Sequence, residues 1–203
     1  GIVMGLHAAY EIFIGGVEIN MDVILTYLPV SALYIVSMAV GYLGLRYIEL
    51  SISSPICNSS GAIVAVLTII TVGIGDEVPP VALVAVALVC IGVIGLGFTE
   101  ANEDEELRRA RQDASNRHYA KSWIAIFIPI VYCLLDALGT FADSRVLELI
   151  DEDSANVAYE LTFLAVGLVS LFYVTVVKKQ RLVAKQEAPK YTGAIFETIG
   201  QFF

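Results

Sequence analysis

Four carboxylates stand inside long apolar runs of this 203-residue sequence, and they are the side chains best placed to do chemistry. A carboxylate at membrane depth costs about 2.5 to 3.5 kcal/mol on insertion scales, which makes it a functional candidate by default. Asp136 is the strongest case, because it lies about two thirds along the apolar run Trp123–Ala142. It is predicted to face a central cavity as a proton or cation site. A position near the outer end of the run, with Thr140 or a backbone group as its partner, is the alternative.

The other three acids give weaker predictions. Glu11 follows His7 by one helical turn, and the two could relay protons, although an interfacial location needs no such role. Glu160 stands only a few residues inside its run and is expected to extend to the interface. Glu197 lies seven residues into the last apolar run and is a further candidate for substrate or proton binding.

A short polar stretch opens another apolar run just after Pro55, which would leave one helix carbonyl without its donor. Asn58 and Ser59 in this stretch could hydrogen-bond a substrate, while hydrogen bonding between helices is the commoner use of such residues. The cysteines all fall in apolar runs and are expected to pack as small hydrophobes: Cys57, Cys90 and Cys133.

No nucleotide-binding loop, metal-ligand cluster or nucleophile elbow occurs in the sequence, and the acids are scattered rather than clustered at one interface. We therefore expect neither an enzyme nor a cofactor or metal.

Long uncharged segments must position these residues. The chain is 57% hydrophobic and 16% charged, against roughly 25% charged in soluble domains. The segment Val23–Gly44 has no charged residue on any helical face, which indicates lipid outside it. The sequence predicts an all-α polytopic membrane protein, in which Gly92 and Gly95 bring a helix close to a neighbour. The complete spans are predicted at Val23–Tyr47, Ser54–Thr71, Val81–Phe98, Trp123–Ala142 and Val157–Val177, with a fragment at each end, Gly1–Gly16 and the run from Tyr191.

The distribution of positive charge predicts an orientation. If the spans alternate, every Lys and Arg except Arg145 falls on one side of the membrane. By the positive-inside rule, loops 99–122 and 178–190 are cytoplasmic and the chain lies in the plasma (inner) membrane. The loops predicted to face outward contain Asp22, Asp76 and Asp151.

The order of elements suggests an internal repeat. The segments Tyr27–Tyr34 and Tyr191–Glu197 are similar in character, and the arrangement of spans and loops restarts after the charged block. An odd number of spans between equivalent positions would make the copies inverted in the membrane. The predicted division is a first repeat at 1–98, a charged linker at 99–122 and a second repeat at 123–203, together an inverted-repeat bundle of transmembrane helices.

The turn between the first two complete spans carries a family resemblance. The run Gly44–Glu49, followed by Ser54-Pro55 and Gly61-Ala62, resembles the third-to-fourth helix hairpin of EamA-type members of the drug/metabolite transporter superfamily. The resemblance implies a piece of a ten-helix protein built of two inverted five-helix repeats. Members of this family usually keep both termini in the cytoplasm, which would place the linker outside; the charge count gives the opposite orientation, and we adopt it here.

The resemblance also implies a function. We expect a secondary active transporter that moves a small organic metabolite or drug-like solute by alternating access, coupled to protons or working by exchange. The expected partners are a small-molecule substrate and the lipid bilayer, with a homodimer left open and no nucleic acid. A structural or accessory membrane subunit is the alternative, and it would tolerate joint neutralisation of the buried acids.

Overall fold

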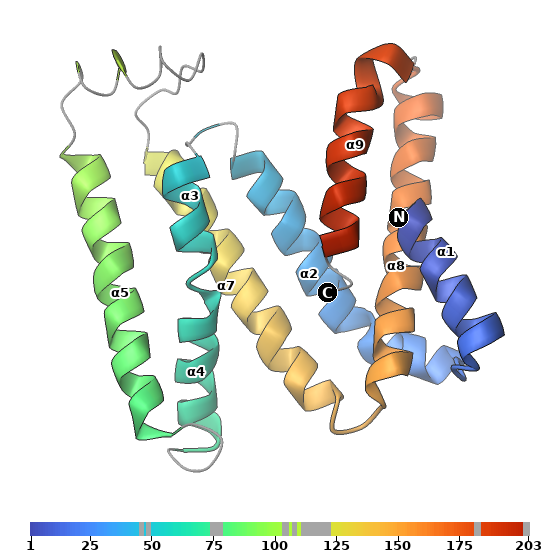
Figure 1. The fold of residues 1–203 in the computed structure, drawn as a ribbon, viewed down its shortest axis with the longest axis horizontal. Helices are drawn as coiled ribbons and strands as arrows, with labels where there is room; N and C mark the ends of the chain where they lie inside the picture. The colour runs from blue at the N-terminus through green and yellow to red at the C-terminus, as the bar shows by residue number, and fades with distance from the viewer. Residues whose placement is uncertain are drawn as a thin grey trace. The chain divides into compact units, whose positions relative to one another are not determined.

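A computed structural model describes residues 1–44, 47, 50–73, 79–102, 106, 109–110, 123–180 and 184–200. Within these ranges every regular element is a helix, which confirms the all-α prediction (Figure 1). The predicted turn around Arg46 and Glu49, the loop at Asp76 and most of linker 99–122 lie outside the described residues. The α-helices are α1 (Ile2–Tyr10), α2 (Met21–Gly44), α3 (Leu50–Cys57), α4 (Ser60–Thr71), α5 (Pro80–Ala101), α7 (Trp123–Val146), α8 (Glu152–Phe172) and α9 (Ala184–Gly200), and two π-helical turns are η1 (Glu11–Gly15) and η2 (Tyr173–Val177).

Three helices are long and apolar enough to cross a membrane: Met21–Gly44, Phe127–Val146 and Glu152–Val177. They correspond to three of the five predicted spans. In the other two predicted spans, the apolar helical stretches within the described residues are Pro55–Thr71 and Leu83–Gly95. Helix α5 as a whole, Pro80–Ala101, has 22 residues, and a bilayer needs about 20. The multi-pass arrangement as a whole stays a prediction.

The chain divides into two compact units. Unit 1 comprises Gly1–Ser31 and Val146–Phe203, and unit 2 comprises Ala32–Arg145. This division follows packing rather than sequence similarity, and it cuts through α2. It therefore leaves the predicted repeats at 1–98 and 123–203 as a prediction.

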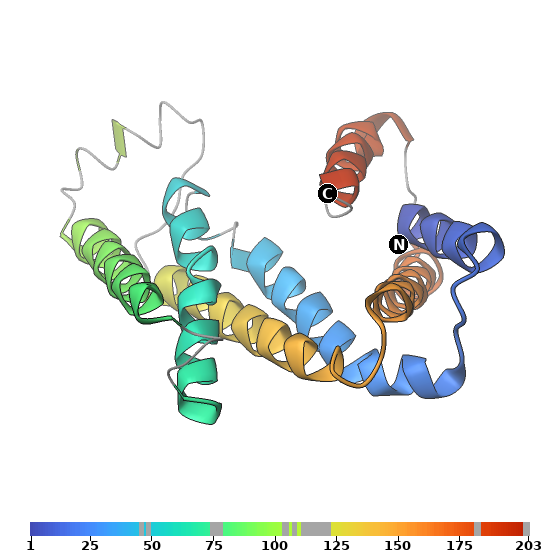
Figure 2. The ribbon, with the colours of Figure 1, turned by 60° about the horizontal axis from the view of Figure 1, so that its bottom comes forward.

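Unit 1 is built on the packing of α1 against α8, which lie side by side in both ribbon views (Figures 1 and 2). Met4 and Ala8 form the buried face of α1, at the spacing of one helical turn. Gly5 allows the close approach, because a Cβ at this position would lie 2.6 Å from Cδ2 of Leu164. After η1 the chain turns at Gly16, whose positive φ of 77° suits glycine.

In unit 2, α3 and α4 pack against α5, and the C-terminal half of α2 meets α7. Glycines make the second contact: a Cβ at Gly41 would lie 2.8 Å from the Tyr132 ring, and one at Gly139 3.2 Å from the Tyr34 ring. A Cβ at Gly92 or Gly95 would meet nothing within 4 Å in the described part of the chain. The close approach predicted on α5 is therefore absent there, because these glycines lie on an uncovered face.

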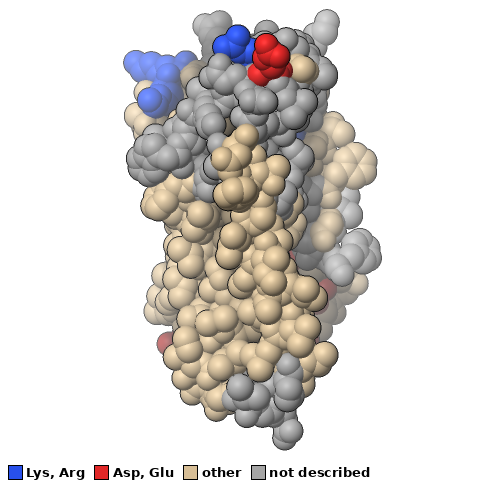
Figure 3. Space-filling model, turned by 90° about the vertical axis from the view of Figure 1, so that its left-hand side faces the viewer, with Lys and Arg blue, Asp and Glu red and all other residues tan. Residues whose placement is uncertain are grey.

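The outer face of α5 is apolar over its length. Figure 3 shows uncharged side chains covering the middle of this side of the molecule, with the Lys and Arg side chains toward its top. Soluble monomers rarely expose so continuous an apolar surface, whereas a lipid-facing helix does. The exposed large residues on this helix include Val81, Val84, Leu88, Ile91, Ile94 and Phe98.

Candidate functional site

Asp136 lies near the middle of a membrane-length helix. Helix α7 runs from Trp123 to Val146, so at about 1.5 Å per residue Asp136 lies about 20 Å along the axis from its start and about 15 Å from its end. The sequence placed it about two thirds along the run, because the predicted span stopped at Ala142 whereas the helix continues to Val146. Among the described residues no hydrogen bond or ion pair reaches Asp136, which is half-buried. Thr140, considered as its partner, instead accepts a hydrogen bond from the Tyr34 hydroxyl at 3.3 Å.

A second candidate feature precedes α7 in the chain. The apolar segment that contains α3 and α4 is interrupted between these two helices, at Asn58 and Ser59. The Ser59 hydroxyl donates to the Ile56 carbonyl at 2.6 Å, and this local bond competes with the regular helix ladder. The sequence predicted one helix beginning at Ser54. The structure instead begins α3 at Leu50 and accommodates Pro55 within it, so that the interruption comes after the proline.

The break faces α7 at the turn before Asp136. Ser59 Oγ lies 3.2 Å from Cys133 Sγ, and both residues are buried. Asp136 follows Cys133 by three residues and so lies on the same side of α7, close enough to interact electrostatically with the thiols of Cys57 and Cys133. We call Ser59, Cys133 and Asp136 the break cluster. The structure thus brings together two residues singled out by the sequence, Ser59 and Asp136, while Asn58 is exposed at the turn.

A second cluster lies in unit 1 and joins α1 to α8. His7 Nδ1 is 2.8 Å from Oε1 of Glu160, and His7 Nε2 is 3.8 Å from Oε1 of Glu11. The side-chain exposures of His7, Glu11 and Glu160 are 40%, 30% and 6%. We call these three residues the imidazole cluster. Glu160 does not extend to the interface as expected, because α1 packs over it and His7 bonds to it.

One oxygen of Glu160 stands out. Oε2 is buried and has no hydrogen-bond partner among the described residues, a state shared only by Ser31 Oγ in that part of the chain. Unsatisfied buried polar atoms are rare and call for an explanation. Glu11, at the other side of the cluster, begins the π-helical turn η1, and its carbonyl accepts from the amides of Gly16 and Val17.

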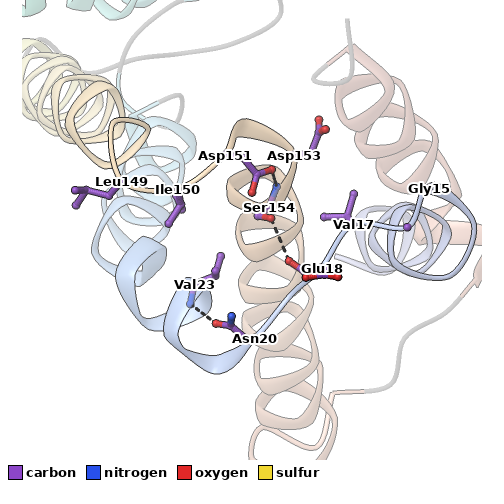
Figure 4. A pocket seen from close by; sticks show the side chains of 11 residues that line it. Gly15, Val17, Glu18, Asn20, Val23, Leu149, Ile150, Asp151, Asp153 and Ser154 are labelled. Carbon is purple, nitrogen blue, oxygen red and sulfur yellow. Dashed lines mark hydrogen bonds between the residues drawn. The ribbon is translucent and has the colours of Figure 1, made fainter.

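A cavity of about 530 Å³ opens in unit 1 where the α1–α2 connection meets the start of α8 (Figure 4). Two of its polar side chains, Asp151 and Ser154, already serve the local backbone. Asp151 accepts from the amide of Ser154 at 3.0 Å and caps α8, and the Ser154 hydroxyl donates to the Glu18 carbonyl at 3.1 Å. Hydrogen bonding from Ser154 lowers the pKa of Asp151 below its ordinary value. The cavity lining is Gly15, Gly16, Val17, Glu18, Asn20, Val23, Leu149, Ile150, Asp151, Asp153 and Ser154.

The remaining candidates add no further site. Glu197 lies on α9, but its side chain is outside the described residues. In the part of the chain that the structure describes, no group of three or more His, Cys, Asp or Glu residues is arranged to hold a metal ion. The three cysteines are free thiols there.

Comparison of the sequence with protein-family models, with curated proteins and with solved structures gave no match. The resemblance to EamA-type transporters therefore stays a prediction from the residues that carry it.

Proposed function

We propose that this chain belongs to a secondary transporter that moves a small organic solute across the plasma membrane by alternating access. Either proton movement drives the solute across the membrane, or the protein exchanges one solute molecule for another. The observation that carries the proposal is Asp136, a carboxylate in the middle of a membrane-length helix to which no described residue bonds.

The argument follows from the cost of that position. A charge at membrane depth is retained where it faces a bundle interior or a water-filled cavity, and such residues mark substrate and ion pathways. A carboxylate without a protein partner can accept hydrogen bonds from a solute that carries an amine or a hydroxyl group. Asp136 is therefore proposed as the group that holds the solute.

The break between α3 and α4 supports the same role. Interrupted helices supply backbone groups for substrate binding in many transporters. Here the interruption lies at Ser59, which contacts Cys133 on the face of α7 that also carries Asp136. In the proposed mechanism two inverted repeats rock about this site and expose it to each side in turn, with loops 99–122 and 178–190 in the cytoplasm.

Uptake and efflux of a pooled panel of metabolites and toxic analogues, in cells that express the complete gene, would test the proposal. The Asp136→Asn variant should reduce movement of the responsive solute by roughly tenfold or more, equivalent to about 1.4 kcal/mol. Asp22→Asn is the matched control, because Asp22 is an exposed residue in the first turn of α2. If no solute moves while the protein is folded in the membrane, the proposal fails and an accessory subunit is favoured.

A further inference from the structure

We infer that the imidazole cluster is a proton-binding site, in which Glu160 is the buried acceptor and His7 passes the proton between Glu160 and Glu11. This inference deepens the proposed function, on which its relevance to transport rests, by naming the coupling ion and the residues that bind it. The sequence predicted a proton relay between His7 and Glu11 and placed Glu160 at the interface instead.

The geometry gives His7 a carboxylate on each side. Nδ1 lies at hydrogen-bond distance from Glu160, and Nε2 lies 3.8 Å from Glu11, which one water or a small side-chain rotation would bridge. An imidazole can take a proton at one nitrogen and release one from the other. The cluster is graded in exposure, because Glu11 is five times more exposed than Glu160, 30% against 6%.

Burial explains why a proton stays in the cluster. An ionised carboxylate with this little exposure needs a positive or hydrogen-bonding partner. An imidazolium supplies the partner when Glu160 is ionised, and a proton on Glu160 removes the need when His7 is neutral. The pair therefore shares one proton, which lies between Nδ1 of His7 and Oε1 of Glu160, 2.8 Å apart.

Each transfer is balanced. At the start Glu11 is protonated, neutral His7 has its proton on Nδ1, and Glu160 is ionised. Glu11 gives its proton to Nε2 while Nδ1 gives its own to Glu160. The result is ionised Glu11, neutral His7 with its proton on Nε2, and protonated Glu160. A return transfer or a ring flip restores the first tautomer.

Few other titratable groups surround the cluster in the described chain. The Tyr10 ring centroid lies 6.5 Å from that of His7 on the same helix segment. On α8, Tyr159 precedes Glu160. On α9, which also contacts α1, Lys190 is exposed, and the side chains of Lys185, Glu187 and Glu197 lie outside the described residues. In the described residues, the ion-pair distances under 4 Å in this cluster join His7 to Glu160 and His7 to Glu11.

Infrared spectroscopy of the complete purified protein in detergent micelles tests the inference without any transported solute. We expect a carbonyl band of a protonated carboxylic acid that titrates with pH and is lost in Glu160→Gln. Glutamine keeps a side chain able to bond to His7, so the packing should survive. Glu152→Gln, the same change in the exposed first turn of α8, should leave the band intact. Survival of the band in Glu160→Gln would overturn the inference.

Two further variants separate proton binding from mere packing. His7→Leu should move the midpoint of the band upward by at least about one pH unit, because the positive charge that stabilises the carboxylate is removed. Glu11→Gln should slow proton exchange into the cluster more than it changes the midpoint. An unchanged midpoint in His7→Leu would contradict the shared proton. The spectrum needs no substrate, so it tests the proton site independently of transport. If the Glu160 band titrates as expected but no solute is transported, the proposed function is rejected and the proton-binding site stands.

Discussion

The two clusters share a feature and differ in one respect that separates their roles. Each centres on a carboxylate in a helix long enough to cross a membrane. Glu160 in unit 1 is buried against an imidazole at 2.8 Å, whereas Asp136 in unit 2 lies near neutral serine and cysteine side chains and receives no bond from a described residue. Membrane depth alone therefore does not define the role of an acid. We therefore propose separate roles, proton exchange for the paired Glu160 and ligand binding for Asp136, to which no described residue bonds.

The largest expected difference between the clusters is in the free energy of unfolding when one of their residues is replaced, which should fall in one cluster and not in the other. His7→Leu leaves Glu160 buried without its partner and should lower the free energy of unfolding by about 3 kcal/mol. Asp136→Asn removes a charge to which no described residue bonds, so stability should stay equal or rise. Equilibrium unfolding in mixed detergent micelles measures both changes. A loss of the same size in both variants would end the distinction between the clusters.

Helix packing in the two units should respond differently to an added methyl group. Gly41→Ala in unit 2 forces the methyl against the Tyr132 ring, and we expect a loss of about 1 to 2 kcal/mol in unfolding free energy. Gly5→Ala in unit 1 meets only the end of the flexible Leu164 side chain, so the loss should be smaller.

Gly92→Ala is the matched control for both glycine variants. Its methyl group would meet no described atom within 4 Å, and alanine is the better helix former. Thermal unfolding in one detergent compares all three proteins. Equal losses at Gly41 and Gly92 would show that the α2–α7 approach is not what makes Gly41 sensitive.

The smallest expected effect is at Asp151, the exposed cap of α8. Its pKa is lowered in the folded chain by Ser154, so its charge stabilises the fold above the ordinary carboxyl pKa of about 4. The contribution is lost as pH falls through the lower folded value. Asp151→Ala should therefore destabilise at neutral pH and much less at strongly acid pH. Asp151→Asn should keep the cap at both, since Asn also accepts from the helix amides. Equal losses for Ala and Asn at neutral pH would contradict the capping role.

Composition and local pattern were enough to predict part of this molecule. Long uncharged runs predicted an all-helical chain, and three runs correspond to helices of membrane length. Asp136 and Ser59 were found because each departs from the apolar character of its own segment. Such a departure is visible in one helix without knowledge of its neighbours.

The rest depended on contacts between distant segments. His7 and Glu160 are 153 residues apart, and no local spacing indicates that α1 packs over Glu160. The interruption after Pro55 was also missed, because a proline near the start of an apolar run equally suits a first helical turn. The helix is interrupted at Asn58 and Ser59, where the Ser59 hydroxyl donates a hydrogen bond back to the carbonyl of Ile56. Gly92 and Gly95 show the opposite error, a packing pattern on a face left uncovered in the described chain.

The most direct test of the account compares two transport modes in proteoliposomes that contain the complete protein, using the solute found in the cell panel. One mode is exchange of solute at equal concentration without a proton gradient, and the other is uphill uptake driven by a proton gradient. We predict that Glu160→Gln keeps exchange and loses uphill uptake, whereas Asp136→Asn loses both. If Glu160→Gln still concentrates the solute in response to the proton gradient, or if Asp136→Asn exchanges as well as the unaltered protein, the assignment of separate roles to the two carboxylates is wrong.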